Sequence, residues 1–261
     1  MKQSTATEQL AEERGWRPDV IDLTRPLTLE TVYALFGDLV ADEESYFRQI
    51  RISTAVDFTT ANATSCYLSI PDHVGTHMDV PVHTVEGGYL LEGADISRLI
   101  GTAVVLDLNR GGIDYAYTAD DLERAAPGVE AGDIVLVYSG FRDARVTERM
   151  RQTYFTVEAA EWLVERGVRA VGVEPCSPDH VHDGLFVHGW ADPANRPAWP
   201  IHGVFLGNEV YIVEGLTNLD RIKGRRVNFA ALPLLVPGLS GSPVRAVAWL
   251  DPPTPATRSG R

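Results

Sequence analysis

Residues 73–83 read HVGTHMDVPVH and contain three of the seven histidines of this 261-residue chain. The candidate metal ligands in the stretch are His73, His77, Asp79 and His83. A helix is disfavoured here, because Gly75 separates the first two histidines and Pro81 restricts the residue before it. We therefore predict a turn followed by an extended segment, in which His77 and Asp79 point to the same side.

This combination of side chains indicates a metal site. Two imidazoles and a carboxylate are a common ligand set for a divalent transition metal that keeps open coordination positions. His73 can reach the other ligands across the turn, where Gly75 leaves room for a backbone close to an ion. A helical zincin motif is excluded, because Val74 stands where that motif has glutamate. The alternative is a surface loop that happens to be rich in histidine.

Composition and charge narrow the function classes. With 44% hydrophobic and 23% charged residues, the chain is typical of a globular protein in water. Its net charge of −13 disfavours nucleic acids and anionic lipids as partners. No apolar run approaches the ~18 residues of a membrane span, and the first residues lack the apolar core of a secretory signal. We therefore expect a cytoplasmic protein.

The cysteines and aromatic residues carry little functional signal. Cys66 and Cys176 are too few for a disulfide framework or a four-thiolate zinc site. A lone cysteine is usually a small buried hydrophobe. Phe58 and Tyr67 could stack on an aromatic substrate, but packing in the core is the simpler expectation.

The pattern along the chain predicts one mixed α/β domain over residues 20–250, with helices packed on a sheet or barrel. A polar arm at 1–19 and a flexible tail at 251–261 would flank it. The β-branched runs that predict strands lie at 20–24, 51–56, 66–70, 102–108, 133–139, 168–173, 209–213, 228–236 and 244–250. Helices are predicted at 118–126 and at 155–167.

The helix at 155–167 has a clear start and stop. Thr156 can cap its first turn, and Gly167 can end it. Because the helix lies between two apolar strands, it has the layout of a β-α-β crossover. Two segments have no such regularity: an insertion at 27–50, and a long loop at 175–200.

The loop at 175–200 contains further candidate ligands. They are His180, His182, His188 and Trp190. The histidines do not match the H-x-H-x-D-H spacing of metallo-β-lactamases, because Asp183 directly follows His182. The four side chains could line a pocket, but exposed or interface positions are the simpler expectation.

The stretch at 73–83 matches the signature H-x-G-T-H-x-D-x-P-x-H, and the chain thereby resembles the metal-dependent cyclase family. That family includes bacterial kynurenine formamidases, isatin hydrolases and proteins linked to polyketide ring closure. The resemblance continues in IDLTRPLT near the start, in residues 158–174 and in residues 231–248. It implies a swivelling β/β/α fold, a small and sometimes aromatic substrate, and a homodimer or homotetramer.

The resemblance also implies a second set of ligands, a histidine and a glutamate twelve residues later. His202 and Glu214 have that spacing. By resemblance, His73, His77 and Asp79 bind one zinc or manganese ion. Asp79, His202 and Glu214 then bind a second, with the Asp79 carboxylate between the two. His83, the last residue of the signature, is implied to be the acid/base.

The implied activity is hydrolysis of an amide-type C–N bond, as in arylformamidases. Three alternatives remain open: a cyclase or dehydratase of polyketide metabolism, a hydrolase of isatin, cyclic imides or lactones, and a metal-binding protein without activity. Glu214 favours the two-metal, formamidase-like branch. However, compact formamidases carry a Trp-Pro stretch where this chain has residues 27–30, so the wall of the substrate pocket should differ.

Overall fold

The computed structural model describes residues 20–36, 49–109, 115–125, 128–141, 152–180 and 199–250. The predicted arm at 1–19 and tail at 251–261 lie outside these residues, as do residues 37–48 of the insertion and most of the loop at 175–200. In the described part of the chain, no helix combines the length and the apolarity that crossing a membrane requires.

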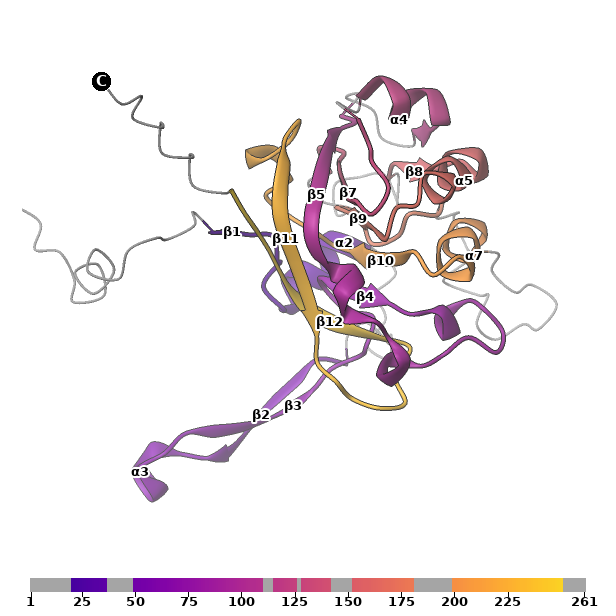
Figure 1. Cartoon of the computed structure of the whole chain (residues 1–261). Coiled ribbons are helices and arrows are strands. Elements are labelled where there is room, and N and C mark those ends of the chain that lie inside the picture. The colour runs from indigo at the N-terminus through magenta and orange to yellow at the C-terminus, as the bar shows by residue number, and fades with distance from the viewer. Residues whose placement is uncertain are drawn as a thin grey trace, which may run out of the picture.

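Among the described residues, seven strands close into a mixed barrel (Figure 1). In spatial order they are β12 (Gly241–Trp249), β11 (Arg226–Pro233), β5 (Ile100–Asp107), β7 (Ile134–Tyr138), β9 (Ala170–Val173), β10 (Tyr211–Glu214) and β4 (His77–Asp79). Strand β4 also pairs with β12, which closes the ring. β5, β7, β9 and β10 run parallel, and β1 (Val20–Asp22) pairs with β12 from outside the ring. The predicted mixed α/β class is confirmed.

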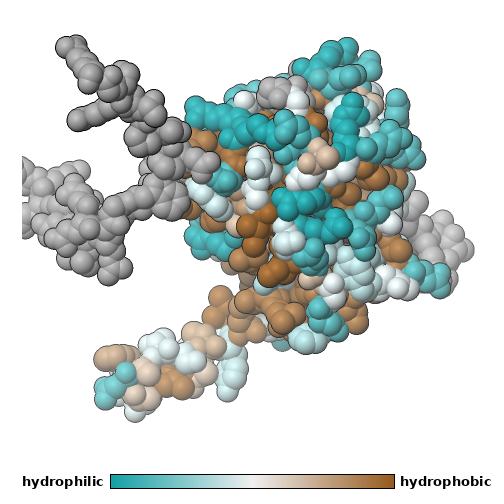
Figure 2. Space-filling view, in the orientation of Figure 1, coloured by the Kyte–Doolittle hydropathy of each residue, from teal (hydrophilic) through white to brown (hydrophobic). Residues whose placement is uncertain are grey.

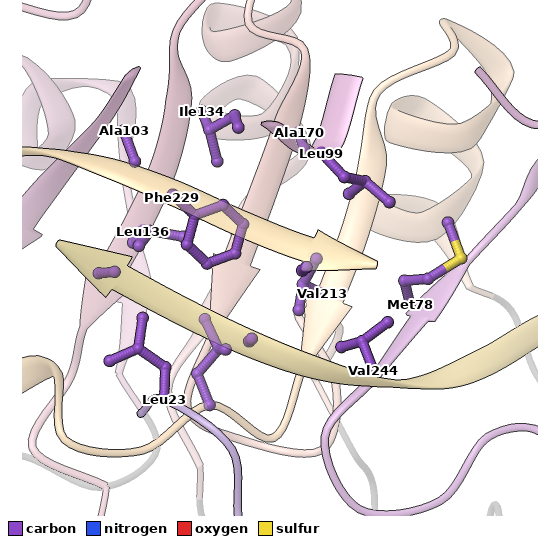
Figure 3. Close-up of a cluster of buried hydrophobic side chains, with 14 of the residues drawn as sticks. Leu23, Met78, Leu99, Ala103, Ile134, Leu136, Ala170, Val213, Phe229 and Val244 are labelled. Atoms are coloured by element: carbon purple, nitrogen blue, oxygen red, sulfur yellow. The ribbon is translucent and has the colours of Figure 1, made fainter. Parts of the chain in front are cut away.

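Side chains that alternate along each strand fill the barrel and cover its outside. On β5, Ala103 and Val105 belong to the inner cluster of apolar residues, whereas Val104 and Leu106 belong to the outer cluster. Figure 3 shows Phe229 among the inward-pointing side chains of the neighbouring strands. Because both faces of the strands are covered by apolar side chains, the strands are continuous apolar, β-branched runs in the sequence.

Three helices, α4 (Ala119–Ala125), α5 (Val157–Glu165) and α7 (Pro200–Gly207), pack against the outer apolar cluster. The helix predicted at 155–167 is confirmed with shorter bounds, because Phe155 belongs to a strand and the helix ends at Glu165. The Thr156 hydroxyl accepts a hydrogen bond from the Ala159 N–H, and Gly167 follows the helix with φ of +71°. Helix α7 was not predicted, since its eight residues, PIHGVFLG, contain two glycines and no polar stripe.

Smaller elements complete the description. Helix α2 (Leu29–Phe36) falls in the predicted insertion, and β2 (Arg51–Val56) and β3 (Ser65–Ser69) form a hairpin that carries the short helix α3 (Phe58–Ala61) at its tip. β6 (Ala116–Tyr117) pairs with β8 (Tyr154–Phe155). The 3₁₀ turns are η3 (Pro81–His83), η4 (Leu91–Gly93), η5 (Ile96–Leu99) and η6 (Leu219–Arg221). Every predicted strand run forms a strand.

Two glycines bring the backbones around β4 and β10 into close contact. Gly75 and Gly215 both have positive φ, at +66° and +67°. A Cβ on Gly215 would lie 2.4 Å from the carbonyl oxygen of Gly75, whereas a Cβ on Gly75 would meet Leu27 at 3.2 Å. The left-handed φ of the turn is itself a reason for glycine at position 75. The close approach depends on Gly215.

Replacing Gly215 with alanine should destabilise the protein more than the same change at Gly224. Both glycines have left-handed φ, which costs about 1–2 kcal/mol for a residue with a Cβ. Only at Gly215 would the new Cβ also overlap backbone, since nothing lies within 4 Å of a Cβ at Gly224. We expect an extra loss of about 1–3 kcal/mol for G215A in equilibrium urea unfolding. Equal losses for the two variants would contradict this account.

Candidate metal site

Strands β4 and β10 place three of the predicted ligand side chains on one outward face. The strands are antiparallel, with His77 directly opposite Glu214. Met78 and Val213 belong to the inner cluster, so the residues that alternate with them, including Asp79, face outward. His77 Nε2 lies 3.3 Å from Glu214 Oε2 and 3.6 Å from Asp79 Oδ1. The predicted extended segment with His77 and Asp79 on one side is confirmed.

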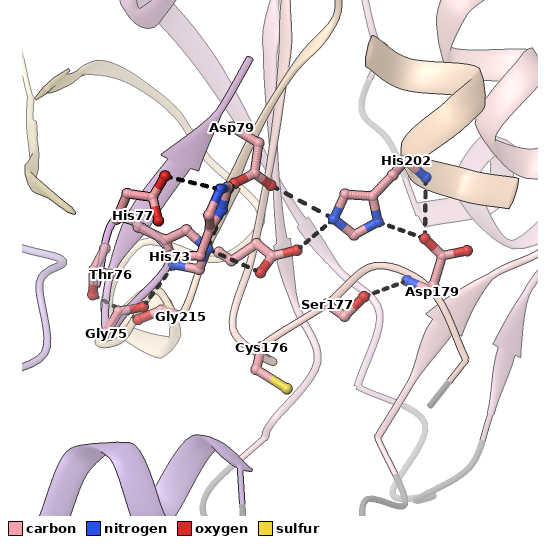
Figure 4. A network of polar contacts seen from close by, with 12 residues as sticks. His73, Gly75, Thr76, His77, Asp79, Cys176, Ser177, Asp179, His202 and Gly215 are labelled. Atoms are coloured by element: carbon pink, nitrogen blue, oxygen red, sulfur yellow. Dashed lines mark hydrogen bonds and ion pairs between the residues drawn. The ribbon is translucent and has the colours of Figure 1, made fainter. Parts of the chain in front are cut away.

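Helix α7 brings His202 to the same face. The helix packs beside β10, and its His202 ring points back toward the strand (Figure 4). His202 Nε2 lies 3.1 Å from Glu214 Oε1 and 3.6 Å from Asp79 Oδ2. The two residues that only the family resemblance had singled out thus meet the signature stretch in space.

His73 precedes β4 in the chain and His83 follows it, and both side chains reach the site. His73 Nδ1 lies 2.7 Å from Asp79 Oδ1. The ring of His83, at the end of η3, stacks on that of His73 with centroids 3.9 Å apart, and it lies 5.5 Å from the His202 ring. All six predicted site residues are therefore brought together, although their individual roles stay predictions.

The ligand atoms form two overlapping groups. His73, Asp79 and His83 offer atoms within 4.8 Å of one another, and so do His77, Asp79 and Glu214. Asp79 belongs to both groups, as expected of a bridging carboxylate. The first group includes His83, so distance alone leaves it open whether His83 binds an ion or acts beside it.

Each of the three predicted ligand histidines has its other ring nitrogen held. His73 Nε2 lies 2.7 Å from the Ser240 hydroxyl, and His77 Nδ1 lies 3.1 Å from the carbonyl oxygen of Gly75. His202 Nδ1 lies 2.5 Å from Asp179 Oδ2. Such partners fix the tautomer of a metal-ligating histidine and leave its second nitrogen free to bind an ion.

The facing carboxylates lack partners that a cation would provide. Within the described residues, neither Asp79 Oδ2 nor Glu214 Oε1 accepts a hydrogen bond of normal geometry. Both residues are buried, with at most 3% of their surface exposed. Two buried carboxylates that face imidazole lone pairs are unfavourable unless a proton or a cation lies among them. Nitrogen and oxygen ligands without thiolate suit zinc or manganese.

The electrostatics of the metal-free site agree with this arrangement. Burial lowers the pKa of His77 to about 4 and that of His83 to about 3. Burial, reinforced by Asp79, raises the pKa of Glu214 to about 7. Burial opposes the charge of His202, but its hydrogen bond to Asp179 and the nearby carboxylates of Asp79 and Glu214 outweigh this effect and raise the pKa. Affinity for positive charge is therefore concentrated where Glu214 and His202 face each other.

Sequence reasoning missed the partners behind the ligands. Asp72 accepts a hydrogen bond from the Ser240 hydroxyl at 2.9 Å, which in turn holds His73. Asp179 holds His202. Ser240 lies 168 residues from Asp72, so no local spacing could have linked them. Asp72 immediately precedes the signature, which is the only signal that it offered.

Other candidates behave differently. Cys176 is buried and burial raises the pKa of its thiol, which keeps it protonated, as expected for a small hydrophobe. Cys66 is exposed, so the same expectation was wrong there. His180 packs against the Tyr154 ring at 4.4 Å. His182, His188 and Trp190 lie outside the described residues.

Comparison with known proteins agrees with the signature. Residues 21–180 match the Cyclase family, described as "Putative cyclase". The chain belongs to this family. Among cyclase-family relatives, a kynurenine formamidase from Geobacillus thermodenitrificans is 30% identical over 182 residues, covering 69% of this chain and 77% of the relative. One from Erythrobacter litoralis is 30% identical over 173 residues, covering 65% and 69%.

The fold agrees with solved cyclase-family structures. Isatin hydrolase A from Ralstonia solanacearum superposes with a TM-score of 0.70 and 27% identity, covering 96% of this chain and 99% of that one. The structural match therefore extends well beyond the region of the signature.

Proposed function

We propose that this cyclase-family protein is a metal-dependent hydrolase of an amide-type C–N bond. The observation that carries the proposal is the buried convergence of imidazoles and carboxylates whose free atoms face one another. The relatives named above are a formamidase and an isatin hydrolase, and enzymes of both names open a bond between a carbonyl carbon and nitrogen. Zinc or manganese fits the ligand set.

We assign the ligands as the sequence predicted. His73 and His77 would hold one ion with Asp79 Oδ1, which lies 2.7 Å from His73 Nδ1 and 3.6 Å from His77 Nε2. His202 and Glu214 would hold a second with Asp79 Oδ2. A divalent ion bound here would lower the pKa of water to near neutrality and stabilise negative charge on a carbonyl oxygen.

His83 is the proposed acid/base. Burial lowers the pKa of His83 to about 3, so the ring is neutral at pH 7, and negative charge developing on a bound substrate would have to raise that pKa for the ring to take up a proton. It is also only partly buried, unlike His77 and His202, so a substrate can reach it. His83 would take a proton from the attacking water and pass it to the departing nitrogen. A protein that only bound metal would have no use for such a base.

The substrate is an amide of small size, and we propose an aryl formamide first. The wall of the site should differ from that of compact formamidases, as the sequence predicts. Val32 and Leu35 of helix α2, in the insertion, pack with Val74 and Cys176 behind the signature stretch. Isatin, a cyclic imide, a lactone and a polyketide-type cyclisation remain the alternatives. Action in the cytoplasm stays a prediction from the sequence.

A turnover screen tests the activity. Protein stripped with a chelator and reloaded with zinc or manganese should hydrolyse at least one of an aryl formamide, isatin and a cyclic imide, and the stripped protein should not. The reason is that the metal ion lowers the pKa of bound water, and the histidine side chains alone do not. Product formation would be followed by absorbance. A lactone is the fourth substrate of the screen. Hydrolysis of the lactone alone, or of none of the four substrates, would contradict amide specificity.

Two substitutions separate the ligands from the base. H83A should lower kcat by about 10²–10⁴-fold while metal content stays at the wild-type level, because the change removes a general base but no metal ligand. D79N should lose metal and activity together. Metal content would be measured by elemental analysis after dialysis. Loss of metal in H83A would instead make His83 a ligand.

We also propose that the protein is a homodimer that docks through the β2–β3 hairpin. Figures 1 and 2 show the hairpin projecting from the barrel with apolar residues along it. Its exposed side chains include Ile52, Phe58, Tyr67 and Leu68, which are 57–70% exposed. The expectation that Phe58 and Tyr67 pack in the core was therefore wrong. A two-stranded ribbon without further packing is marginally stable in water, which calls for a partner.

A second copy of the chain fits the hairpin best. The end of β11 and the loop after it expose a second apolar strip, made of Leu232, Leu234, Leu235 and Val236. Hairpin and strip together offer a surface of the ~20–30 residues a side that standard interfaces use. The chain has a net charge of −13, but Arg51 and Asp57 are the only charged residues of the hairpin. Docking of two copies through the hairpin would therefore bring few like charges together. Reciprocal docking of hairpin on strip closes a two-fold dimer.

Acidic substitutions on the hairpin should break the dimer. Wild type should elute with twice the chain mass of 28.6 kDa in light scattering, and the double variant F58D/Y67D should elute as a monomer, because charge would be buried in the interface. The matched control is I96D, an exposed apolar position on η5. A monomeric wild type, or a double variant that stays dimeric, would contradict the proposal.

A further inference from the structure

We infer that Asp179 is a positioning residue, whose single carboxylate both starts helix α7 and turns the His202 ring toward the ion; this inference rests on the proposed function. Asp179 is 1% exposed and lies beyond β9. Its Oδ1 accepts a hydrogen bond from the Ile201 N–H at 2.8 Å. Its Oδ2 accepts one from the His202 N–H at 3.1 Å and lies 2.5 Å from Nδ1 of the same residue.

Helix α7 depends on this carboxylate because no other side chain among the described residues is seen to cap it. Its N-cap residue, Trp199, makes no side-chain hydrogen bond to the helix, and Pro200 has no N–H to offer. The first N–H groups that need an acceptor therefore belong to Ile201 and His202, and Asp179 accepts from both. The partial positive charge at a helix N-terminus favours a carboxylate in its ionised form.

An ionised carboxylate can only accept, which fixes the His202 tautomer. The hydrogen between Asp179 Oδ2 and His202 Nδ1 must sit on the imidazole. When an ion takes the place of any proton on Nε2, the lone pair of that atom faces Asp79 and Glu214. His202 thus differs from the other predicted ligand histidines, which are held by a neutral hydroxyl and a backbone carbonyl.

Asp179 is itself held in place from the other side. Its N–H donates to the Ser177 hydroxyl at 3.1 Å, and the Gln152 side chain donates to the carbonyl oxygens of Ser177 and, at 3.4 Å, of Asp179. The backbone of Asp179 is therefore held in place, and a change of its side chain should act on the start of helix α7 and on the His202 ring.

The variant D179N tests the inference because an amide cannot accept at both of its ends. In either orientation the NH₂ group faces an N–H donor or the His202 ring. We expect zinc to bind D179N about 10–100-fold more weakly than wild type, in competition with a chelating dye. This measurement needs no substrate and no turnover.

The matched control is T156A, which removes the cap of the neighbouring helix α5 and touches no site residue. Its zinc affinity should equal that of wild type. If T156A loses as much zinc affinity as D179N, Asp179 is only a helix cap and the inference is overturned. Equal affinity of D179N and wild type overturns the inference alone, whereas a wild type that binds no zinc overturns the proposed function as well.

A second measurement uses the wild type and so does not depend on how the variant folds. In zinc-loaded protein, ¹H–¹⁵N correlation spectra of the imidazoles should show a hydrogen on Nδ1 of His202, protected from exchange with water. D179N, where it folds, should lose that protection. A His202 ring that binds zinc through Nδ1 would contradict the inference.

Discussion

Strand β4 is the constraint on which both the fold and the site depend. It is three residues long, yet it pairs with β10 on one side and β12 on the other, and so closes the barrel. Met78 fills the interior, while His77 and Asp79 point outward. Because side chains alternate along a strand, a slip of one residue would turn both ligands inward and expose Met78. The packing of one methionine therefore helps to fix the register of two ligands.

The site that this register creates is costly without an ion. The carboxylates of Asp79 and Glu214 are both buried and carry like charge. Burying a charged side chain costs several kcal/mol unless an opposite charge lies beside it. The barrel resists relaxation, since its interior is packed with apolar side chains and Gly215 holds the ends of β10 and the signature turn together. The fold thus maintains an arrangement of charge that only a cation, or shared protons, can compensate.

Local sequence patterns predict much of the fold and part of the site. The remaining features depend on contacts between distant residues, which local patterns do not reveal. Outward alternation of His77 and Asp79 follows from an extended chain, and α5 follows from Thr156 and Gly167. Helix α7 gave no pattern, because its N-terminal N–H groups are satisfied by Asp179, over twenty residues earlier in the chain. The meeting of His202 and Glu214 with the signature depends on how the strands pair, so only the family resemblance could anticipate it.

The hairpin was misread for a related reason. Its apolar residues satisfy the same composition rule as core strands, and sequence alone does not say whether an apolar face is covered by its own chain or by another. Its position matters for the site as well. Strand β3 ends at Ser69, and His73 follows only four residues later. A docked hairpin would restrain the chain just ahead of His73, so that assembly and ligand geometry become linked through a short, stiff connection. The stacking of His83 on His73 would extend that restraint to the proposed base.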